Sequence, residues 1–190
     1  MIEILLITIL YSKYHKLKIK PFLRSWNLYV VVVLTILYIG LTATIFLGHY
    51  DFIQYRKFFH IALFSSFVIM AALNNISFKQ LFTSLSCFMF GNILNRIAIT
   101  RNNGKMPVFP TNSIATGFVT KEMIANNTLL NISPMHTIAD PINTKVIPLC
   151  DIFDLGYTIF SIGDLFIYLA LSIILIDKII KLNGSGSNVV

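Results

Sequence analysis

Apolar runs joined by short polar links fill most of this chain, and one long polar stretch precedes the last of them. The apolar runs are Met1–Ser12, Asn27–Gly48, Phe58–Leu73, Phe78–Ile99 and Tyr157–Ile176. A membrane crossing of about 30 Å needs roughly 20 residues at about 1.5 Å per residue, so the first run is short for one. Because lipid offers no partners to unpaired backbone groups, the runs should be helices. The pattern therefore predicts an all-α membrane protein, a bundle of four to five transmembrane helices.

The polar stretch, Thr100–Tyr157, makes up about a third of the chain. It contains five prolines, which break helices and favour turns, but it also keeps apolar side chains along its length. A disordered linker would have few of these side chains, so we expect a long ordered extracytoplasmic loop before the last helix. Within the loop, Ser113–Asn126 should form one or two short helices, with Gly117 between them.

The composition favours the same class of protein. Hydrophobic residues make up 56% of the chain, charged residues only 12%, and the mean hydropathy is +0.76. An average soluble domain has about twice that share of charged residues. We therefore interpret residues 1–182 as a single integral membrane domain, with its loop or cap at 100–156, and residues 183–190 as a flexible tail.

The net charge of +7 does not indicate nucleic-acid binding, because no DNA- or RNA-binding motif is present. Five of the fifteen basic residues lie in one short segment beside an apolar run: Lys13, Lys16, Lys18, Lys20 and Arg24. Such a segment is typical of a cytoplasmic anchor that faces anionic lipid. Counting helices from it places the protein in the cell membrane as a multi-pass protein, with the long loop outside and the carboxyl terminus in the cytoplasm.

Motifs for catalysis or metal binding are absent. The sequence has no HExxH, no CxxC pair and no GxSxG, and nothing in the spacing of Cys87 and Cys150 indicates a disulfide. The polar stretch does contain residue types that bind zinc, namely His136, Asp140, Cys150, Asp151 and Asp154, but without a recognisable spacing. We predict no metal and no cofactor. Asn126 and Asn131 begin glycosylation sequons, which are common by chance.

Asp164 lies inside the last apolar run, where a carboxylate needs a partner. Arg96 is the predicted partner, because it lies near the end of the preceding run, at a matching depth. Asn92 and Arg96 are four residues apart and share a helix face, and Asn95 lies beside that stripe. A stripe of small and polar residues serves helix packing or lines a pocket, and the sequence leaves both open. Asp164 itself is either a structural anchor or a proton, cation or ligand site.

Four segments together resemble a known family: NRIAITRNNGKMPV at Asn95–Val108, PMHT at Pro134–Thr137, IPLCDIF at Ile147–Phe153 and FSIGDLFI at Phe160–Ile167. Their order and spacing are similar to those of the small bacterial integral membrane proteins grouped as domain of unknown function 5317. The chain departs from that pattern at Asn103, at Cys150 and around Gly156–Thr158. The resemblance implies one constellation of polar and turn residues, and no activity: Arg101, Lys105, Met106, Pro107, His136, Asp151, Gly163 and Asp164.

Two classes of function remain. The first is a non-enzymatic binding or scaffold protein that presents a polar outer cap. The alternative is a membrane-embedded enzyme acting on a lipid-linked substrate, with His136, Asp151 and Asp164 as acid–base candidates, or a small transporter subunit. The expected partners are the lipid bilayer and a membrane protein or a second copy of the chain, with no nucleic acid.

Overall fold

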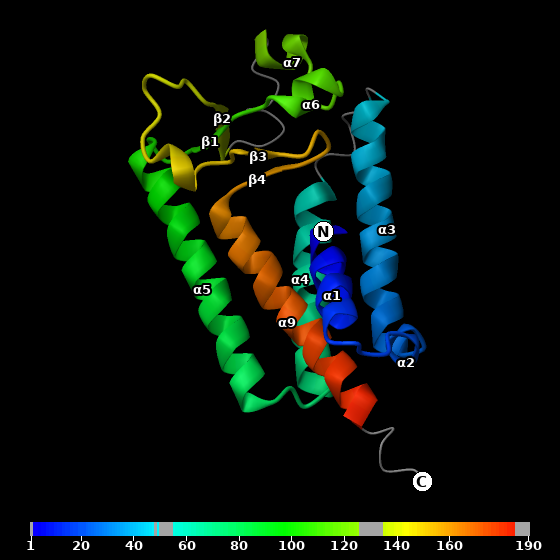
Figure 1. Cartoon of the computed structure of the whole chain (residues 1–190). Coiled ribbons are helices and arrows are strands. Elements are labelled where there is room, and N and C mark those ends of the chain that lie inside the picture. Colours follow the sequence, from blue (N-terminus) through cyan, green and yellow to red (C-terminus); the bar gives the residue numbers. More distant parts are fainter. Residues whose placement is uncertain (1, 48, 50–54, 126–134, 185–190) are drawn as a thin grey trace. The chain divides into compact units, whose positions relative to one another are not determined.

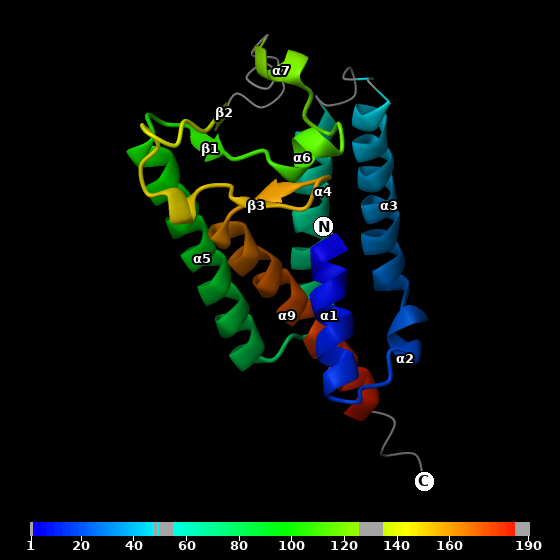
Figure 2. The same cartoon turned by 45° about the horizontal axis from the view of Figure 1, so that its top comes forward.

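The computed structural model describes residues 2–47, 49, 55–125 and 135–184, and these are mostly helical (Figures 1 and 2). The α-helices in this part are α1 (Ile2–Tyr14), α2 (Lys20–Leu23), α3 (Trp26–Phe46), α4 (Arg56–Leu73), α5 (Phe78–Arg101), α6 (Asn112–Ala115), α7 (Lys121–Ala125) and α9 (Ile162–Gly184). A 3-10 turn, η2, covers Ile147–Leu149. The last two residues of α9, Asn183 and Gly184, were predicted to belong to the flexible tail, and the rest of that tail lies outside the described residues.

Four short strands modify the all-α prediction. β1 (Met106–Val108) and β2 (His136–Ile138) pair in parallel, with Met106 opposite His136. β3 (Phe153–Asp154) and β4 (Ile159–Phe160) pair as an antiparallel hairpin just before α9. β1, β2 and β3 lie in the stretch that was expected to be an ordered loop. β4 lies in the last apolar run, Tyr157–Ile176, which was expected to be helical from its beginning, whereas α9 begins only at Ile162.

The structure contradicts the predicted bundle of transmembrane helices. In the part of the chain that it describes, no helix combines the length and the apolar character that a membrane crossing requires. α1 has only 13 residues, α4 opens with two basic residues, and α9 includes Asp164 and Asp177. The prediction of a multi-pass protein of the cell membrane, with the loop outside and the carboxyl terminus in the cytoplasm, is contradicted together with the bundle.

The chain divides into two compact units. Unit 1 consists of Met1–Gly40, Tyr55–Phe88 and Tyr168–Val190, and unit 2 consists of Leu41–Gln54 and Met89–Ile167. The long helices α3, α5 and α9 therefore each contribute residues to both units.

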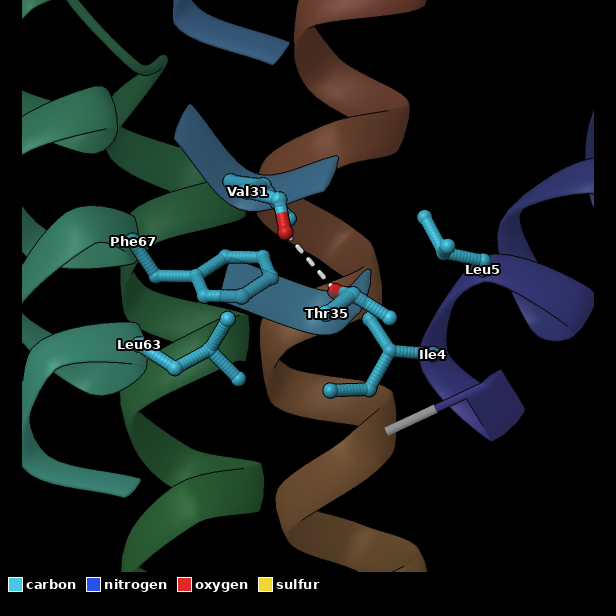
Figure 3. Close-up of a pocket in the computed structure, with 6 residues that line it drawn as sticks. All are labelled: Ile4, Leu5, Val31, Thr35, Leu63 and Phe67. Atoms are coloured by element: carbon cyan, nitrogen blue, oxygen red, sulfur yellow. Dashed lines mark hydrogen bonds between the residues drawn. The ribbon is translucent and has the colours of Figure 1, made fainter. Parts of the chain in front are cut away.

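Unit 1 is held by an apolar core to which α1, α3, α4 and α9 contribute. Leu171, Leu175 and Ile179 recur every four residues on α9, so they lie on one face of that helix, and all three are buried. A narrow crevice in this core has no room for a water molecule. It is lined by six side chains (Figure 3): Ile4, Leu5, Val31, Thr35, Leu63 and Phe67. The hydroxyl of Thr35 donates to the carbonyl of Val31 at 2.7 Å, so its polar atom is satisfied within the helix.

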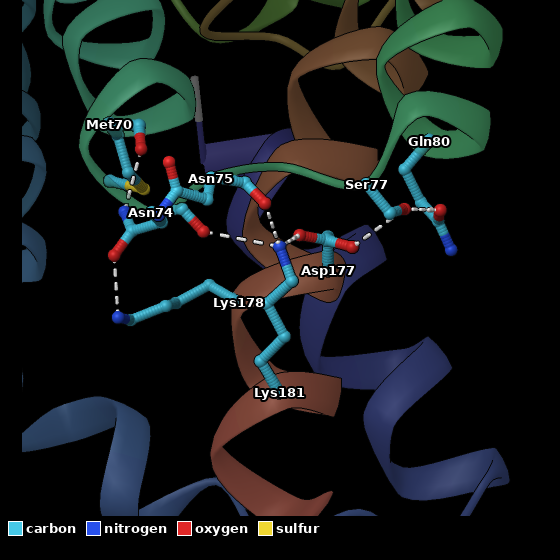
Figure 4. Close-up of polar contacts among 8 residues, drawn as sticks. All are labelled: Met70, Asn74, Asn75, Ser77, Gln80, Asp177, Lys178 and Lys181. Carbon is cyan, nitrogen blue, oxygen red and sulfur yellow. Dashed lines mark hydrogen bonds and ion pairs between the residues drawn. The ribbon is translucent and has the colours of Figure 1, made fainter.

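Within unit 1, a buried carboxylate on α9 holds the turn between α4 and α5 (Figure 4). Asp177 is 4% exposed, and its Oδ2 lies 2.7 Å from Nζ of Lys181, one helical turn away. Lys181 also donates to the carbonyl of Asn75 at 2.5 Å, and Ser77 Oγ donates to Asp177 Oδ1 at 3.3 Å. The charge is thus compensated, which a carboxylate in this setting requires.

In unit 2, α5 and α9 approach each other at two glycines. A Cβ atom on Gly91 would lie 2.4 Å from the carbonyl oxygen of Gly163, and one on Gly163 would lie 2.6 Å from the carbonyl oxygen of Gly91. Both distances are far below van der Waals contact, so only glycine fits at either position. Gly163, a member of the predicted constellation, therefore has a packing role.

The prediction of short helices within Ser113–Asn126 is confirmed for the described residues, because α6 and α7 lie there. Gly117 separates them and has a φ of +77°, in the left-handed region that glycine adopts without strain. Asn126 itself, and the two predicted glycosylation sequons, lie outside the described residues.

Candidate functional site

β1 is the central strand of the candidate site. On one side, the amide of Met106 donates to the carbonyl of Met135 at 2.7 Å. On the other side, the amide of Asp151 donates to the carbonyl of Pro107 at 3.0 Å, and the amide of Phe109 donates to the carbonyl of Asp151 at 2.9 Å. Three segments that are distant in the sequence are thereby fixed side by side. Four of the eight residues in the predicted constellation meet here: Met106, Pro107, His136 and Asp151.

His136 and Asp151 form the most chemically suggestive pair in this group. His136 Nε2 lies 3.5 Å from Asp151 Oδ2, and the side chains are 41% and 6% exposed, respectively. A carboxylate held beside an imidazole fixes the orientation of the ring. Such a pair can hold a proton or present a positive charge to a ligand.

Cys150, next to Asp151, is not an activated nucleophile. It is fully buried against Ala98 and Met106. Burial raises the pKa of the Cys150 thiol, and the negative charge of Asp151 raises it further. The thiol is therefore protonated at neutral pH, and the thiolate is the reactive form.

Three cations are arranged around Asn102, just after α5. The amide of Lys105 donates to the carbonyl of Asn102 at 3.1 Å. The side chain of Asn102 accepts from the amide of Lys145 at 2.8 Å and donates to the carbonyl of Lys145 at 2.9 Å. Arg101 is the neighbouring residue in the chain. We refer to Arg101, Lys105 and Lys145 as the basic face of unit 2.

Asp164 has a different partner from the one predicted. Its Oδ1 accepts from Asn95 Nδ2 at 2.8 Å, and its Oδ2 accepts from the amide of Ser161 at 3.0 Å. Ser161 Oγ in turn accepts from the amide of Asp164 at 3.0 Å and donates to Asn95 Oδ1 at 2.7 Å. This reciprocal pattern is a capping box at the start of α9, tied to α5 through Asn95.

Arg96 takes no part in this arrangement, and the predicted Arg96–Asp164 pair is wrong. Arg96 and Asn92 are both exposed on α5. Adjacent residues on an α-helix differ by about 100° in direction, so at most one of Asn95 and Arg96 can face Asp164. The hydrogen bonds thus divide the predicted residues into a group around β1 and a group around the start of α9.

Mutations at these positions separate the two pairings. We expect Asp164→Ala to lower the free energy of unfolding by about 1–2 kcal/mol, because a helix cap and a bond to α5 are lost. Arg96→Gln should change it by less than about 0.5 kcal/mol. In double-mutant cycles from chemical denaturation, Asn95→Ala should couple to Asp164→Ala, whereas Arg96→Gln should be additive with it. Coupling of Arg96→Gln to Asp164→Ala would instead support the predicted Arg96–Asp164 pair.

Asp154 is the residue whose role the sequence reasoning missed. It is 7% exposed, and its carboxylate accepts hydrogen bonds from the amides of Thr111, Ser113 and Gly156 and from Ser113 Oγ, at 2.6–2.8 Å. Burial by itself raises the pKa of Asp154, but these hydrogen bonds outweigh it and hold the pKa below the ordinary 3.8. The Asp-x-Gly spacing of Asp154 and Gly156 is the one local signal of this turn.

Comparison with known proteins gives one match. The sequence model of a family described as "Family of unknown function (DUF5317)" matches residues 18–176. No curated protein and no solved structure matches the chain. Across the described residues, no three histidine, cysteine or acidic side chains are grouped so that they could hold a metal ion.

Proposed function

The chain belongs to the family of unknown function DUF5317 and, because that membership supplies no activity, we propose from its geometry that it is a non-catalytic binding protein. Its recognition surface is the basic face of unit 2, formed by Arg101, Lys105 and Lys145. The partner is an acidic segment of another protein. This proposal keeps the binding role expected from the sequence and gives it a surface and a ligand chemistry.

The observation that carries the proposal is the fixed placement of these cations. Asn102 holds the backbone of both Lys105 and Lys145, and its Nδ2 also donates to the carbonyl of Ala98 at 2.8 Å, within α5. Among the described residues, none of the three cationic side chains forms a hydrogen bond or an ion pair. A backbone that is already held in place loses less conformational entropy on binding, so a partner gains more from the cations that this backbone carries.

Helix electrostatics account for only part of this arrangement. A cation in the last turn of a helix is stabilised by the helix dipole, and this suffices for Arg101. Lys145 follows α5 by more than 40 residues in the chain and still lies beside its end through Asn102. The helix dipole does not require that second contact, whereas a recognition surface benefits from it.

Catalysis at the His136–Asp151 pair is the second candidate, supported by the distance of 3.5 Å and the half-exposed ring. The other residues that could assist it already have structural roles. Ser161 and Asp164 cap α9, Asp154 holds the turn before α6, and the Cys150 thiol is buried. For that reason we favour binding over catalysis.

Binding of a fluorescein-labelled oligoglutamate peptide, followed by fluorescence anisotropy, tests the proposal. The triple variant Arg101→Gln/Lys105→Gln/Lys145→Gln should bind the peptide about tenfold more weakly or worse, as expected for losing at least one charge-assisted hydrogen bond. The effect should shrink at high salt, because exposed charges are screened.

The matched control is Lys13→Gln/Lys79→Gln/Lys121→Gln, which removes three exposed cations from other parts of the chain. It lowers the net charge by the same amount and should reduce affinity by no more than about twofold, since only diffuse attraction is lost. Equal losses in the two variants would show that the peptide responds to net charge alone, and would refute the basic face.

A further inference from the structure

A second cationic feature lies in unit 1, in the segment that leads from α1 to α3. An open recess of about 640 Å³ is lined by Lys18, Ile19, Lys20, Pro21 and Arg24. Its size falls within the range of small-molecule sites, roughly 300–1,000 Å³. Three of the five lining residues are cations and none is acidic, so the recess selects for negative charge.

The backbone of the recess is fixed at its beginning by α9. The amide of Lys18 donates to Asn183 Oδ1 at 2.8 Å, and Asn183 Nδ2 donates to the carbonyl of Lys18 at 3.0 Å. Asn183 Nδ2 also donates to the carbonyl of Ile179 at 2.8 Å, which holds the amide group against its own helix. Lys18 is thereby attached through both of its backbone polar groups to a residue 165 positions away.

The other end of the recess is anchored in the core of unit 1. Phe22, in α2, is only 4% exposed and belongs to the apolar core cluster. Pro21 restricts its own φ, and the amide of Arg24 donates to the carbonyl of Pro21 at 3.3 Å. The backbone that carries the three cations is therefore held at Lys18, Phe22 and Arg24.

The cationic side chains themselves are available for a ligand. Lys18, Lys20 and Arg24 are exposed, and within the described part of the chain their side chains form no hydrogen bond or ion pair. An arginine guanidinium binds phosphate oxygens in a bidentate manner, and lysines add point charges around it. Ile19 and Pro21 supply apolar wall beside the cations, which suits a ligand with a carbon skeleton next to its phosphate.

From these observations we infer that the recess formed by Lys18, Lys20 and Arg24 binds a phosphate-bearing ligand. The inference is independent of the basic face of unit 2, because it concerns other residues and a different ligand. The same phosphate chemistry is offered by a soluble phosphomonoester and by the headgroup of an anionic lipid, so the experiment includes one probe of each kind.

Two binding measurements on the purified full chain test the inference. Glycerol 3-phosphate is titrated by calorimetry, and vesicles of phosphatidylglycerol in phosphatidylcholine are used for co-sedimentation, with pure phosphatidylcholine as the blank. Saturable binding to glycerol 3-phosphate assigns a soluble ligand, and binding to phosphatidylglycerol vesicles alone assigns a headgroup. Either result supports the recess, and binding to neither probe would overturn it.

Substitutions in the recess and elsewhere in the chain show which residues bind the probe. Lys18→Gln/Lys20→Gln/Arg24→Gln should weaken the affinity for the bound probe about tenfold or more. The control Lys13→Gln/Lys79→Gln/Lys121→Gln should weaken it by about twofold at most. Asn183→Ala keeps every charge but releases Lys18, so it should weaken binding severalfold while circular dichroism still shows a folded protein. Equal losses in the two triple variants would contradict the assignment to the recess.

Discussion

Replacing Gly91 by alanine should lower the free energy of unfolding by about 2–3 kcal/mol, near the upper end of the range for overpacking. The new methyl group would lie 2.4 Å from the carbonyl oxygen of Gly163, which belongs to the backbone of α9 and cannot rotate away. Alanine also improves helix propensity by up to about 1 kcal/mol, so the steric term must exceed that gain to give a net loss.

Gly40→Ala is the matched control for this substitution. Gly40 is likewise inside a long helix, α3, but a Cβ atom there meets nothing within 4 Å. This variant should therefore be up to about 1 kcal/mol more stable than the parent protein in chemical denaturation. If Gly91→Ala were stabilised to the same degree, the close approach of α5 and α9 in unit 2 would be wrong.

Replacing Asp154 by alanine should lower the free energy of unfolding by about 3–5 kcal/mol at neutral pH. The substitution removes the carboxylate that accepts four hydrogen bonds. The amides of Thr111, Ser113 and Gly156 thereby lose this acceptor. Each buried amide without a partner costs about 1–3 kcal/mol, and part of that loss is recovered as water enters. Asp140→Asn is the control, because Asp140 is an exposed carboxylate in a local turn, and it should have little effect.

The loss caused by Asp154→Ala should depend on pH. The pKa of Asp154 is lower in the folded protein than the ordinary value of 3.8, so the ionised carboxylate stabilises the folded state. That contribution is complete above the unfolded pKa and is lost as the pH falls through the lower folded pKa. The difference between the parent protein and Asp154→Ala should thus be constant near neutrality and shrink below about pH 4. A difference that grew in acid would contradict the hydrogen-bonded, ionised Asp154.

The sequence located several features of unit 2 correctly. The turn residues around Gly117 predicted two short helices, because glycine and proline act locally and need no knowledge of the fold. The resemblance to the family grouped His136 with Met106, Pro107 and Asp151. It could not show how these residues are arranged, which the parallel pairing of β1 with β2 determines.

The errors have physical causes. Asp164 was recognised as needing a partner, but chain order sets only the depth of Arg96 and not its rotation about the axis of α5, and Asn95 faces Asp164 instead. Two of the three amides that donate to Asp154 belong to Thr111 and Ser113, more than 40 positions away, and the sequence does not show which backbone amides meet a carboxylate. The membrane-spanning bundle was inferred from composition and from runs of apolar residues, whereas the helix boundaries and the polar positions inside them decide whether a helix can cross.

The central claim is that the basic face of unit 2 is the recognition surface, and amide chemical shifts test it most directly. Titration of isotopically labelled protein with the oligoglutamate peptide should shift the amide signals of Arg101, Asn102, Lys105 and Lys145 most strongly, in a saturable way. The amide of Asp154, which is buried in the same unit, should stay unchanged. Largest shifts at His136 and Asp151, with the basic face unaffected, would contradict the claim and favour chemistry at that pair.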